Sequence, residues 1–233
     1  MSENDKSPHL SEAAAVFASA PSQKMMEAHE LIGAEAALAK IMFPQQVLTD
    51  KHMSKAENLI TRFGSLAGVI NASAVELNRE GVDMATFYMF QAVNATMLHV
   101  LKAEIEKGPL IDSWDALTDY LTATMAHKTQ EHFKILFLDR KNNLIADENQ
   151  SLGTVDHVPV YPREVVKRAL ELNASAIILA HNHPSGNPQP SKEDIAMTKQ
   201  IVDACETVGI TVHDHTIVGH NGLFKSFKSL GLM

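Results

Sequence analysis

Residues 174–180 have the sequence ASAIILA, and the three residues that follow, 181–183, are His-Asn-His. A nearly uninterrupted apolar run of this length is expected for a strand that is buried on both faces of a sheet. A loop rich in proline and glycine then extends to Pro190. The pattern predicts a central strand whose carboxyl end carries two histidines.

The sequence on both sides of this strand alternates between strands and helices. Residues 133–138 predict a strand, which a polar turn at 140–143 connects to a return strand at 144–146. A helix over 194–208 is expected to end at Gly209. Further strands are predicted at 158–161, 210–218 and 222–227, and further helices at 114–125 and 162–172. We expect an α/β (α+β) fold, in which helices flank a mixed sheet.

The residues before Gly108-Pro109 have a different pattern of polar and apolar residues from those that follow. Residues 1–30 are polar, and we expect them to be partly disordered. Residues 31–107 predict a small all-helical domain, and residues 108–233 predict the α/β domain. The helices are expected at 31–43, 55–63, 75–79 and 85–107, with interruptions at Gly64, Gly68 and Gly81.

Composition limits the function classes. The 233 residues are 45% hydrophobic and 21% charged, as in globular proteins, and the formal net charge is −8. An acidic chain is a poor candidate for binding nucleic acid through phosphate neutralisation. The single cysteine, Cys205, excludes an internal disulfide and a zinc site made of several cysteines. No basic, apolar leader or spanning segment stands out, so we expect a cytoplasmic protein without a membrane segment.

The residues after the apolar strand indicate a metal site. His181 and His183 are two positions apart, so in extended backbone their side chains point the same way. The Pro- and Gly-rich loop can turn back and bring Asp194, at the start of the next helix, over the strand end. Two imidazoles and one carboxylate leave a coordination position for water, as in catalytic zinc sites. Ser191 and Asp194 also match a helix N-cap and its third residue, which would stabilise the helix without a metal.

Residues 133–227 resemble the JAMM/MPN-type (JAB) domain of the bacterial RadC family. The matching stretches are QEHF at 130–133, PREV at 162–165, the block at 181–194 and DHTIVG at 214–219. The resemblance implies a zinc metallohydrolase fold related to the deubiquitinating isopeptidases, with one Zn²⁺ per chain and a protein or peptide substrate. It implies that His181, His183 and Asp194 hold the zinc, that Ser191 supports the oxyanion, and that Glu131 acts on the water.

Some assignments stay open at this point. Glu131 shares strand parity with Phe133, and its rivals for the role of acid and base are Glu148 and Glu164. By alternation, His213 and His215 are expected on one face, where they either line the site or are ordinary histidines of an edge strand.

RadC-type chains are often labelled DNA repair proteins with an N-terminal helix-hairpin-helix module, which residues 59–66 and 71–77 resemble. Here, however, Gly81-Val82-Asp83 has an acid in place of the second glycine of the hairpin turn, and an acid repels phosphate. Residues 31–107 hold seven basic against eight acidic residues. We therefore expect a degenerate module that serves packing or homodimerisation. The alternative function is a DNA-associated protein whose metal site serves phosphodiester chemistry or structure alone.

Overall fold

The structure is a computed structural model that describes residues 33–152, 160–220 and 222–233. Contacts between residues divide the chain into two compact units, one up to Phe90 and one from Gln91. The division falls inside the long helix α7 (Met84–Ile105), so the second half of α7 belongs to the unit with the sheet. The predicted polar segment 1–30 lies outside the described residues, and the predicted domain ranges remain predictions.

The first unit consists of helices whose ends follow from their sequence. Ser65 and Ser73 each begin a short helix, because the side-chain oxygen accepts a hydrogen bond from the backbone N–H three residues later. Gly64 ends the helix before them with a φ of +80°, a conformation that glycine adopts without strain. The helices are α3 (Ala34–Met42), α4 (Asp50–Phe63), α5 (Leu66–Asn71), α6 (Ala74–Arg79) and the start of α7.

Helix α5 is not predicted from the sequence, in which Gly68 indicates an interruption. In the structure Gly68 lies inside α5, and its N–H donates a 2.9 Å hydrogen bond to Ser65 Oγ. A Cβ atom at this position would lie 2.2 Å from the carbonyl oxygen of Phe63. Gly68 is therefore required by a close approach of two backbone segments rather than by a helix end.

The second unit is built on a five-stranded sheet with the order β2-β1-β3-β4-β5. The central strand β3 (Ala176–Asn182) pairs antiparallel with β1 (His132–Leu138) and parallel with β4 (Thr211–Val218). The helix α10 (Lys192–Thr207) connects the two parallel strands, since parallel neighbours need a long crossover. The edge strands, both antiparallel to their neighbours, are β2 (Leu144–Leu152) and β5 (Phe224–Ser226). The mixed sheet predicted from the sequence is confirmed.

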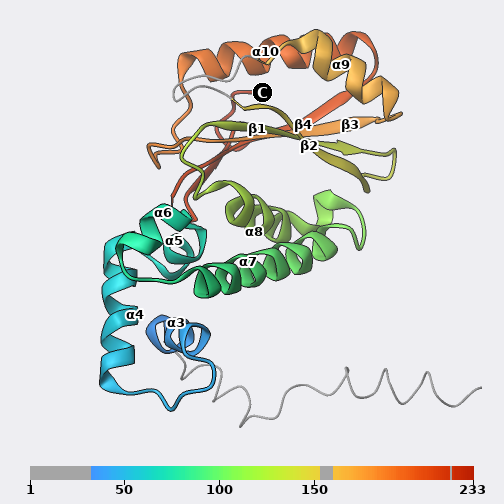
Figure 1. Ribbon diagram of the computed structural model, residues 1–233. Coiled ribbons are helices and arrows are strands. Elements are labelled where there is room, and N and C mark those ends of the chain that lie inside the picture. Colours follow the sequence, from blue (N-terminus) through green and yellow to red (C-terminus); the bar gives the residue numbers. More distant parts are fainter. Residues whose placement is uncertain (1–32, 153–159, 221) are drawn as a thin grey trace, which may run out of the picture. The chain divides into compact units, whose positions relative to one another are not determined.

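Helices cover both faces of this sheet, as Figure 1 shows. On one face, α9 (Pro162–Glu171) and α10 pack over a core that includes Leu179 of β3. On the other face, α8 (Trp114–Met125) and the short 3-10 helix η1 (Leu110–Ser113) pack over a core that includes Ile178. All residues of β3 are buried, which confirms the prediction of a strand buried on both faces.

Two predictions about strands are wrong in detail. Val160 and Tyr161 precede α9 without belonging to a strand, and the rest of the predicted strand 158–161 lies outside the described residues. The return strand does not end at Ala146 but continues to Leu152, because it pairs along the whole length of β1. Cross-strand pairing, rather than the local sequence, determines how far this strand extends.

A β-bulge in β4 separates the two histidines that alternation places on one face. Ile177 pairs with Val212 and Ile178 pairs with Asp214, so His213 is an extra residue between the two pairs. Such an insertion shifts the alternation of side chains by one position. The expectation that His213 and His215 share a face is therefore wrong.

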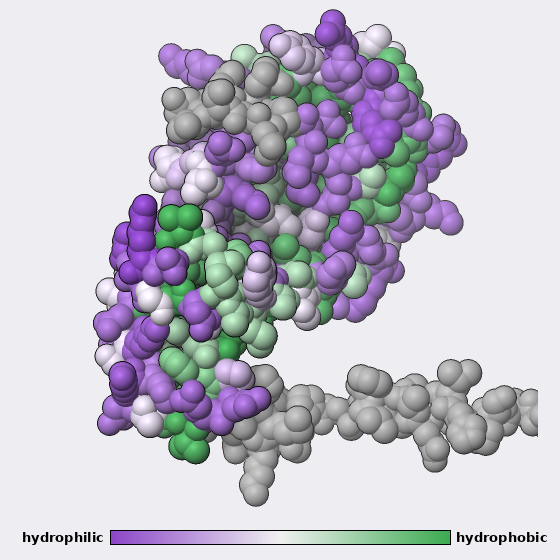
Figure 2. All heavy atoms as spheres, viewed as in Figure 1, coloured by the Kyte–Doolittle hydropathy of each residue, from purple (hydrophilic) through white to green (hydrophobic). Residues whose placement is uncertain are grey.

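The surface of the second unit that is visible in Figure 2 is formed mainly by hydrophilic residues, with smaller apolar areas between them. Among the residues that the structure describes, no helix combines the length and the apolar character needed to cross a bilayer.

Candidate metal centre

Three side chains that could bind a metal meet at the carboxyl end of β3. His181 lies in the strand, His183 follows it directly, and Asp194 lies in the first turn of α10. Their ligand atoms all lie within 4.8 Å of one another. No other such group of at least three His, Cys, Asp or Glu side chains occurs in residues 33–152, 160–220 and 222–233. The predicted ligands are thus brought together, and the set could bind a metal.

The nitrogen atoms that face this point are the Nε2 atoms of both histidines, which lie 3.0 Å apart. His181 Nε2 lies 3.3 Å from Asp194 Oδ1, and His183 Nε2 lies 3.4 Å from Asp194 Oδ2. His181 and Asp194 are buried, and His183 is partly exposed. A ligand would therefore reach the centre from the side of His183.

The loop between the ligands is held in place by its backbone. His183 N–H donates to the carbonyl oxygen of Val218, and His220 N–H donates to that of Gly186. Gly186 has a φ of +80°, and a Cβ atom there would lie 2.6 Å from His220 Nδ1. These contacts turn the chain back sharply, as the Pro- and Gly-rich sequence predicts, and bring α10 over the strand end.

The electrostatics of the centre favour a cation. Burial opposes ionisation of Asp194, yet the neighbouring imidazoles of His181 and His183 hold the pKa of its carboxyl far below the usual range. The adjacent carboxylate of Asp194 in turn raises the pKa of His183. A carboxylate that stays ionised beside two imidazoles is the donor set of a zinc site that retains an open position.

The hydrogen bonds of His183 provide a test of whether these residues fit a metal. Its Nδ1 lies 2.8 Å from the carbonyl oxygen of Asn187. A carbonyl oxygen only accepts hydrogen bonds, so Nδ1 carries the proton of the neutral ring. His183 Nε2 then carries a lone pair that is directed at His181 and Asp194. A metal ion at that position would accept this lone pair. The residues fit the metal.

Further contacts lie behind His181. Its Nδ1 is 2.8 Å from His215 Nε2, and His215 Nδ1 is 2.6 Å from the hydroxyl of Thr198. Phe133 stacks on His181 with a centroid distance of 6.0 Å. The sequence left open whether His215 lines the site or is an ordinary histidine of an edge strand. The structure shows that His215 contacts the site. Thr198 is not predicted from the sequence, although its position four residues after Asp194 places both on one helix face.

Ser191 is the N-cap of α10, as the sequence predicts. Its Oγ accepts a hydrogen bond from Asp194 N–H at 3.0 Å and donates one to Asp194 Oδ2 at 2.6 Å. The same carboxyl oxygen accepts from Ser191 N–H at 2.7 Å. Ser191 is exposed and adjacent to a candidate ligand, while its role at an oxyanion stays a prediction.

Glu131 lies immediately before β1 and is partly buried. Asn182 holds this segment, because its Oδ1 accepts from His132 N–H at 2.8 Å and its Nδ2 donates to the carbonyl oxygen of Gln130 at 3.1 Å. After the contact with Asp194, the charge of Glu131 is among the further causes that raise the pKa of His183. Glu131 is therefore near the centre, and its catalytic role stays a prediction.

The two rival glutamates have other partners. Glu148 accepts hydrogen bonds from both Nε and Nη2 of Arg168, at 2.8 and 2.6 Å. Glu164 is exposed in the first turn of α9 and pairs with Arg163 at 3.2 Å. Neither has a hydrogen bond or ion pair with the three candidate ligands in the part of the chain that the structure describes.

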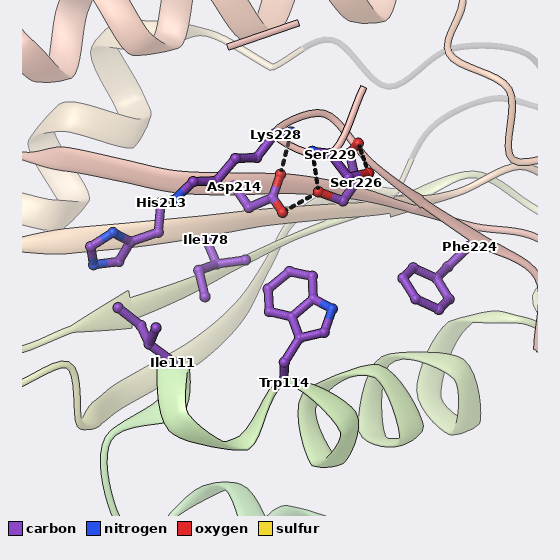
Figure 3. Close-up of a pocket in the computed structure, with 9 residues that line it drawn as sticks. All are labelled: Ile111, Trp114, Ile178, His213, Asp214, Phe224, Ser226, Lys228 and Ser229. Carbon is purple, nitrogen blue, oxygen red and sulfur yellow. Dashed lines mark hydrogen bonds between the residues drawn. The ribbon is translucent and has the colours of Figure 1, made fainter. Parts of the chain in front are cut away.

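A cavity of about 530 Å³ lies on the opposite face of the sheet, between β4, β5 and α8 (Figure 3). Asp214 points into it, but its oxygens accept hydrogen bonds from Ser226 Oγ and from the backbone N–H groups of His215 and Lys228. His213 Nε2 lies 2.8 Å from Asn142 Oδ1. The cavity is lined by Ile111, Trp114, Ile178, His213, Asp214, Phe224, Ser226, Lys228 and Ser229. It is separate from the candidate metal centre.

Comparison with known proteins agrees with this geometry. Residues 111–232 match the family described as the RadC-like JAB domain. A UPF0758 protein of Rhodobacter capsulatus is 51% identical over 179 residues, which cover 76% of this chain and 83% of the relative. A UPF0758 protein of Ruegeria pomeroyi is 50% identical over 179 residues, which cover 76% of this chain and 80% of the relative. With the ligand-forming strand end and helix start both inside the matched region, the chain belongs to the family of proteins with a RadC-like JAB domain.

Proposed function

We propose that this protein is a zinc-dependent hydrolase that cleaves an amide bond in a protein or peptide, as a metallopeptidase or isopeptidase of the JAMM type. Membership of the JAB-domain family indicates a metal-dependent hydrolase. The observation that carries the proposal is the convergence of His181, His183 and Asp194 on one point that is accessible from the side of His183.

The protein residues divide the work as follows. When bound by the three ligands, zinc would polarise the scissile carbonyl and lower the pKa of coordinated water toward about 7. Glu131 takes the proton of the attacking water and passes it to the leaving amine. Ser191 Oγ turns from Asp194 toward the substrate and donates a hydrogen bond to the developing oxyanion, a contact that contributes about 3 kcal/mol in comparable sites.

The zinc content of the purified protein tests the first half of the proposal. We expect close to one equivalent of zinc by mass spectrometry when the chain is purified without chelator, and a large loss in His183→Ala. Zinc below about one tenth of an equivalent in the wild type, unchanged in the variant, would contradict a metal site.

Peptide cleavage tests the second half. The zinc-loaded chain is incubated with a diverse peptide library and with isopeptide-linked conjugates, and new amino termini are identified by mass spectrometry. Cleavage that disappears on chelation and in His183→Ala supports the proposal. The same chain incubated with single-stranded and duplex DNA tests phosphodiester chemistry, and nuclease activity without peptide cleavage would favour the alternative function.

A further inference from the structure

A chain of hydrogen bonds connects the two buried ligands through residues that the proposed mechanism does not use. Thr198 Oγ1 donates to the carbonyl oxygen of Asp194 at 2.6 Å. His215 Nδ1 lies 2.6 Å from the same hydroxyl oxygen, and His215 Nε2 lies 2.8 Å from His181 Nδ1. Thr198 is 1% exposed, and His215 and His181 are 0% exposed, so water does not compete for these groups.

The direction of each hydrogen bond determines where the protons lie. Because Thr198 Oγ1 uses its one proton toward Asp194, it accepts a hydrogen bond from His215 Nδ1–H. The neutral ring of His215 then presents a lone pair at Nε2, which accepts from His181 Nδ1–H. In this arrangement every group in the series of hydrogen bonds has a partner, and His181 Nε2 is left without a proton.

The bare Nε2 of His181 is the atom that faces His183 and Asp194. If the hydrogen bonds ran in the opposite direction, with Thr198 donating to His215, the proton of the His181 ring would lie on Nε2. It would then block that atom as a ligand. The direction of these hydrogen bonds therefore decides whether His181 Nε2 is available to bind a metal. His183 does not need this support, since the carbonyl of Asn187 determines its tautomer.

We propose that His215 and Thr198 are positioning residues that hold His181 in the tautomer able to bind a metal. The inference rests on the proposed metal site. It extends that site from three ligands to a buried relay that begins at the backbone of one ligand, Asp194, and ends at the ring of another, His181. Outer partners of this kind orient a ligand ring and increase its basicity.

The first experiment compares Thr198→Val with Thr198→Ser in the full-length chain. Valine has nearly the shape of threonine but lacks the hydroxyl, whereas serine retains it. Zinc dissociation constants are measured by competition with a chromophoric chelator, and thermal unfolding of the metal-free proteins reports folding. We expect Thr198→Val to bind zinc about 10- to 100-fold more weakly and Thr198→Ser to stay within about threefold of the wild type. Equal affinity of Thr198→Val and wild type, or equal loss in both variants, would overturn the inference.

The second experiment needs no variant. Long-range ¹H–¹⁵N NMR spectra of the metal-free wild type report which ring nitrogen of each histidine carries the proton. We expect His215 to be protonated at Nδ1 and His181 at Nδ1. A proton on His215 Nε2 would overturn the inference while leaving the metal site intact. A wild type that binds no zinc would overturn both the inference and the proposed function, whereas zinc binding without hydrolysis would overturn only the function.

Discussion

At the scale of single residues, one oxygen atom of Asp194 belongs both to a helix cap and to the candidate metal centre. Oδ2 accepts hydrogen bonds from Ser191 Oγ and Ser191 N–H, which begin α10, and it also lies 3.4 Å from His183 Nε2. Helix capping and metal binding are therefore not alternative interpretations of this sequence. The cap orients the carboxylate, and its Oδ1 remains directed at His181.

Glu131 is expected to be the acid and base of the reaction. Glu131→Gln keeps the shape of the side chain but cannot accept a proton, so kcat should fall by about 10²- to 10⁴-fold. Zinc content should stay at the wild-type level, because Glu131 is not among the candidate ligands. The rate is measured with a peptide that the wild type cleaves.

Glu164→Gln is the matched control for this change, since Glu164 is exposed and pairs with Arg163. It should leave kcat unchanged. If both variants retain wild-type activity, Glu131 is not the proton carrier.

At the scale of elements, the loop before α10 depends on one glycine. Gly186→Ala forces a side chain into a φ of +80° and places Cβ 2.6 Å from His220 Nδ1. We expect a loss of about 1–3 kcal/mol in the free energy of unfolding and weaker zinc binding, because this loop connects His183 to Asp194. Chemical denaturation and chelator competition measure the two effects.

Gly108→Ala provides the comparison, since a Cβ atom at Gly108 would meet no other atom within 4 Å. Its stability should stay within about 0.5 kcal/mol of the wild type. A Gly186→Ala variant that behaves like Gly108→Ala would show that the loop tolerates the side chain.

Asp147 joins several elements on the other side of the sheet. It accepts hydrogen bonds from Lys134 of β1 at 2.8 Å and from Tyr120 of α8, and it lies 3.4 Å from Lys102 of α7. Asp147→Asn leaves the buried ammonium of Lys134 without its counter-charge. We expect a loss of about 2–4 kcal/mol in the free energy of unfolding by urea at pH 7. The exposed pair of Glu104 with Lys107 is the control, and Glu104→Gln should cost less than about 0.5 kcal/mol.

The effect of Asp147→Asn should depend on pH. Burial alone would raise the pKa of Asp147, but hydrogen bonds from Lys134 and Tyr120 lower it below the usual value. Its contribution to stability is therefore complete above the unfolded pKa of about 3.9 and is lost as the pH falls toward the lower folded pKa. Urea denaturation at pH 7, 5 and 3 should show the difference between wild type and variant shrinking at pH 3. A difference that stays constant would contradict the ion-pair explanation.

The secondary structure that the sequence predicts correctly is local in origin. β3 is apolar along its length and α10 begins at a Ser-x-x-Asp cap, so neither needs distant residues to be recognised. The bulge at His213 and the length of β2 are different, since each depends on register with a neighbouring strand. Residues that alternate in sequence do not alternate in space once a bulge intervenes.

At the scale of the whole molecule, charge argues against tight binding of DNA. The net charge is −8, and Asp83 stands where a phosphate-binding hairpin would have glycine. Fluorescence anisotropy with labelled duplex and single-stranded DNA at low salt should show no binding with a dissociation constant below about 1 μM. Sub-micromolar binding that weakens steeply with salt would show that local basic groups overcome the overall charge.

The sequence by itself determined the candidate ligands, because a two-residue spacing on a strand and a capped helix start are local features. It also determined the mixed sheet with flanking helices through the pattern of apolar runs. Only the tertiary structure decided which side chain contacts Nδ1 of His181. His215 is 34 residues away along the chain and reaches His181 because β3 and β4 pair in parallel past a bulge. Strand register is a collective result of packing and hydrogen bonding across the sheet, and no single segment of sequence encodes it.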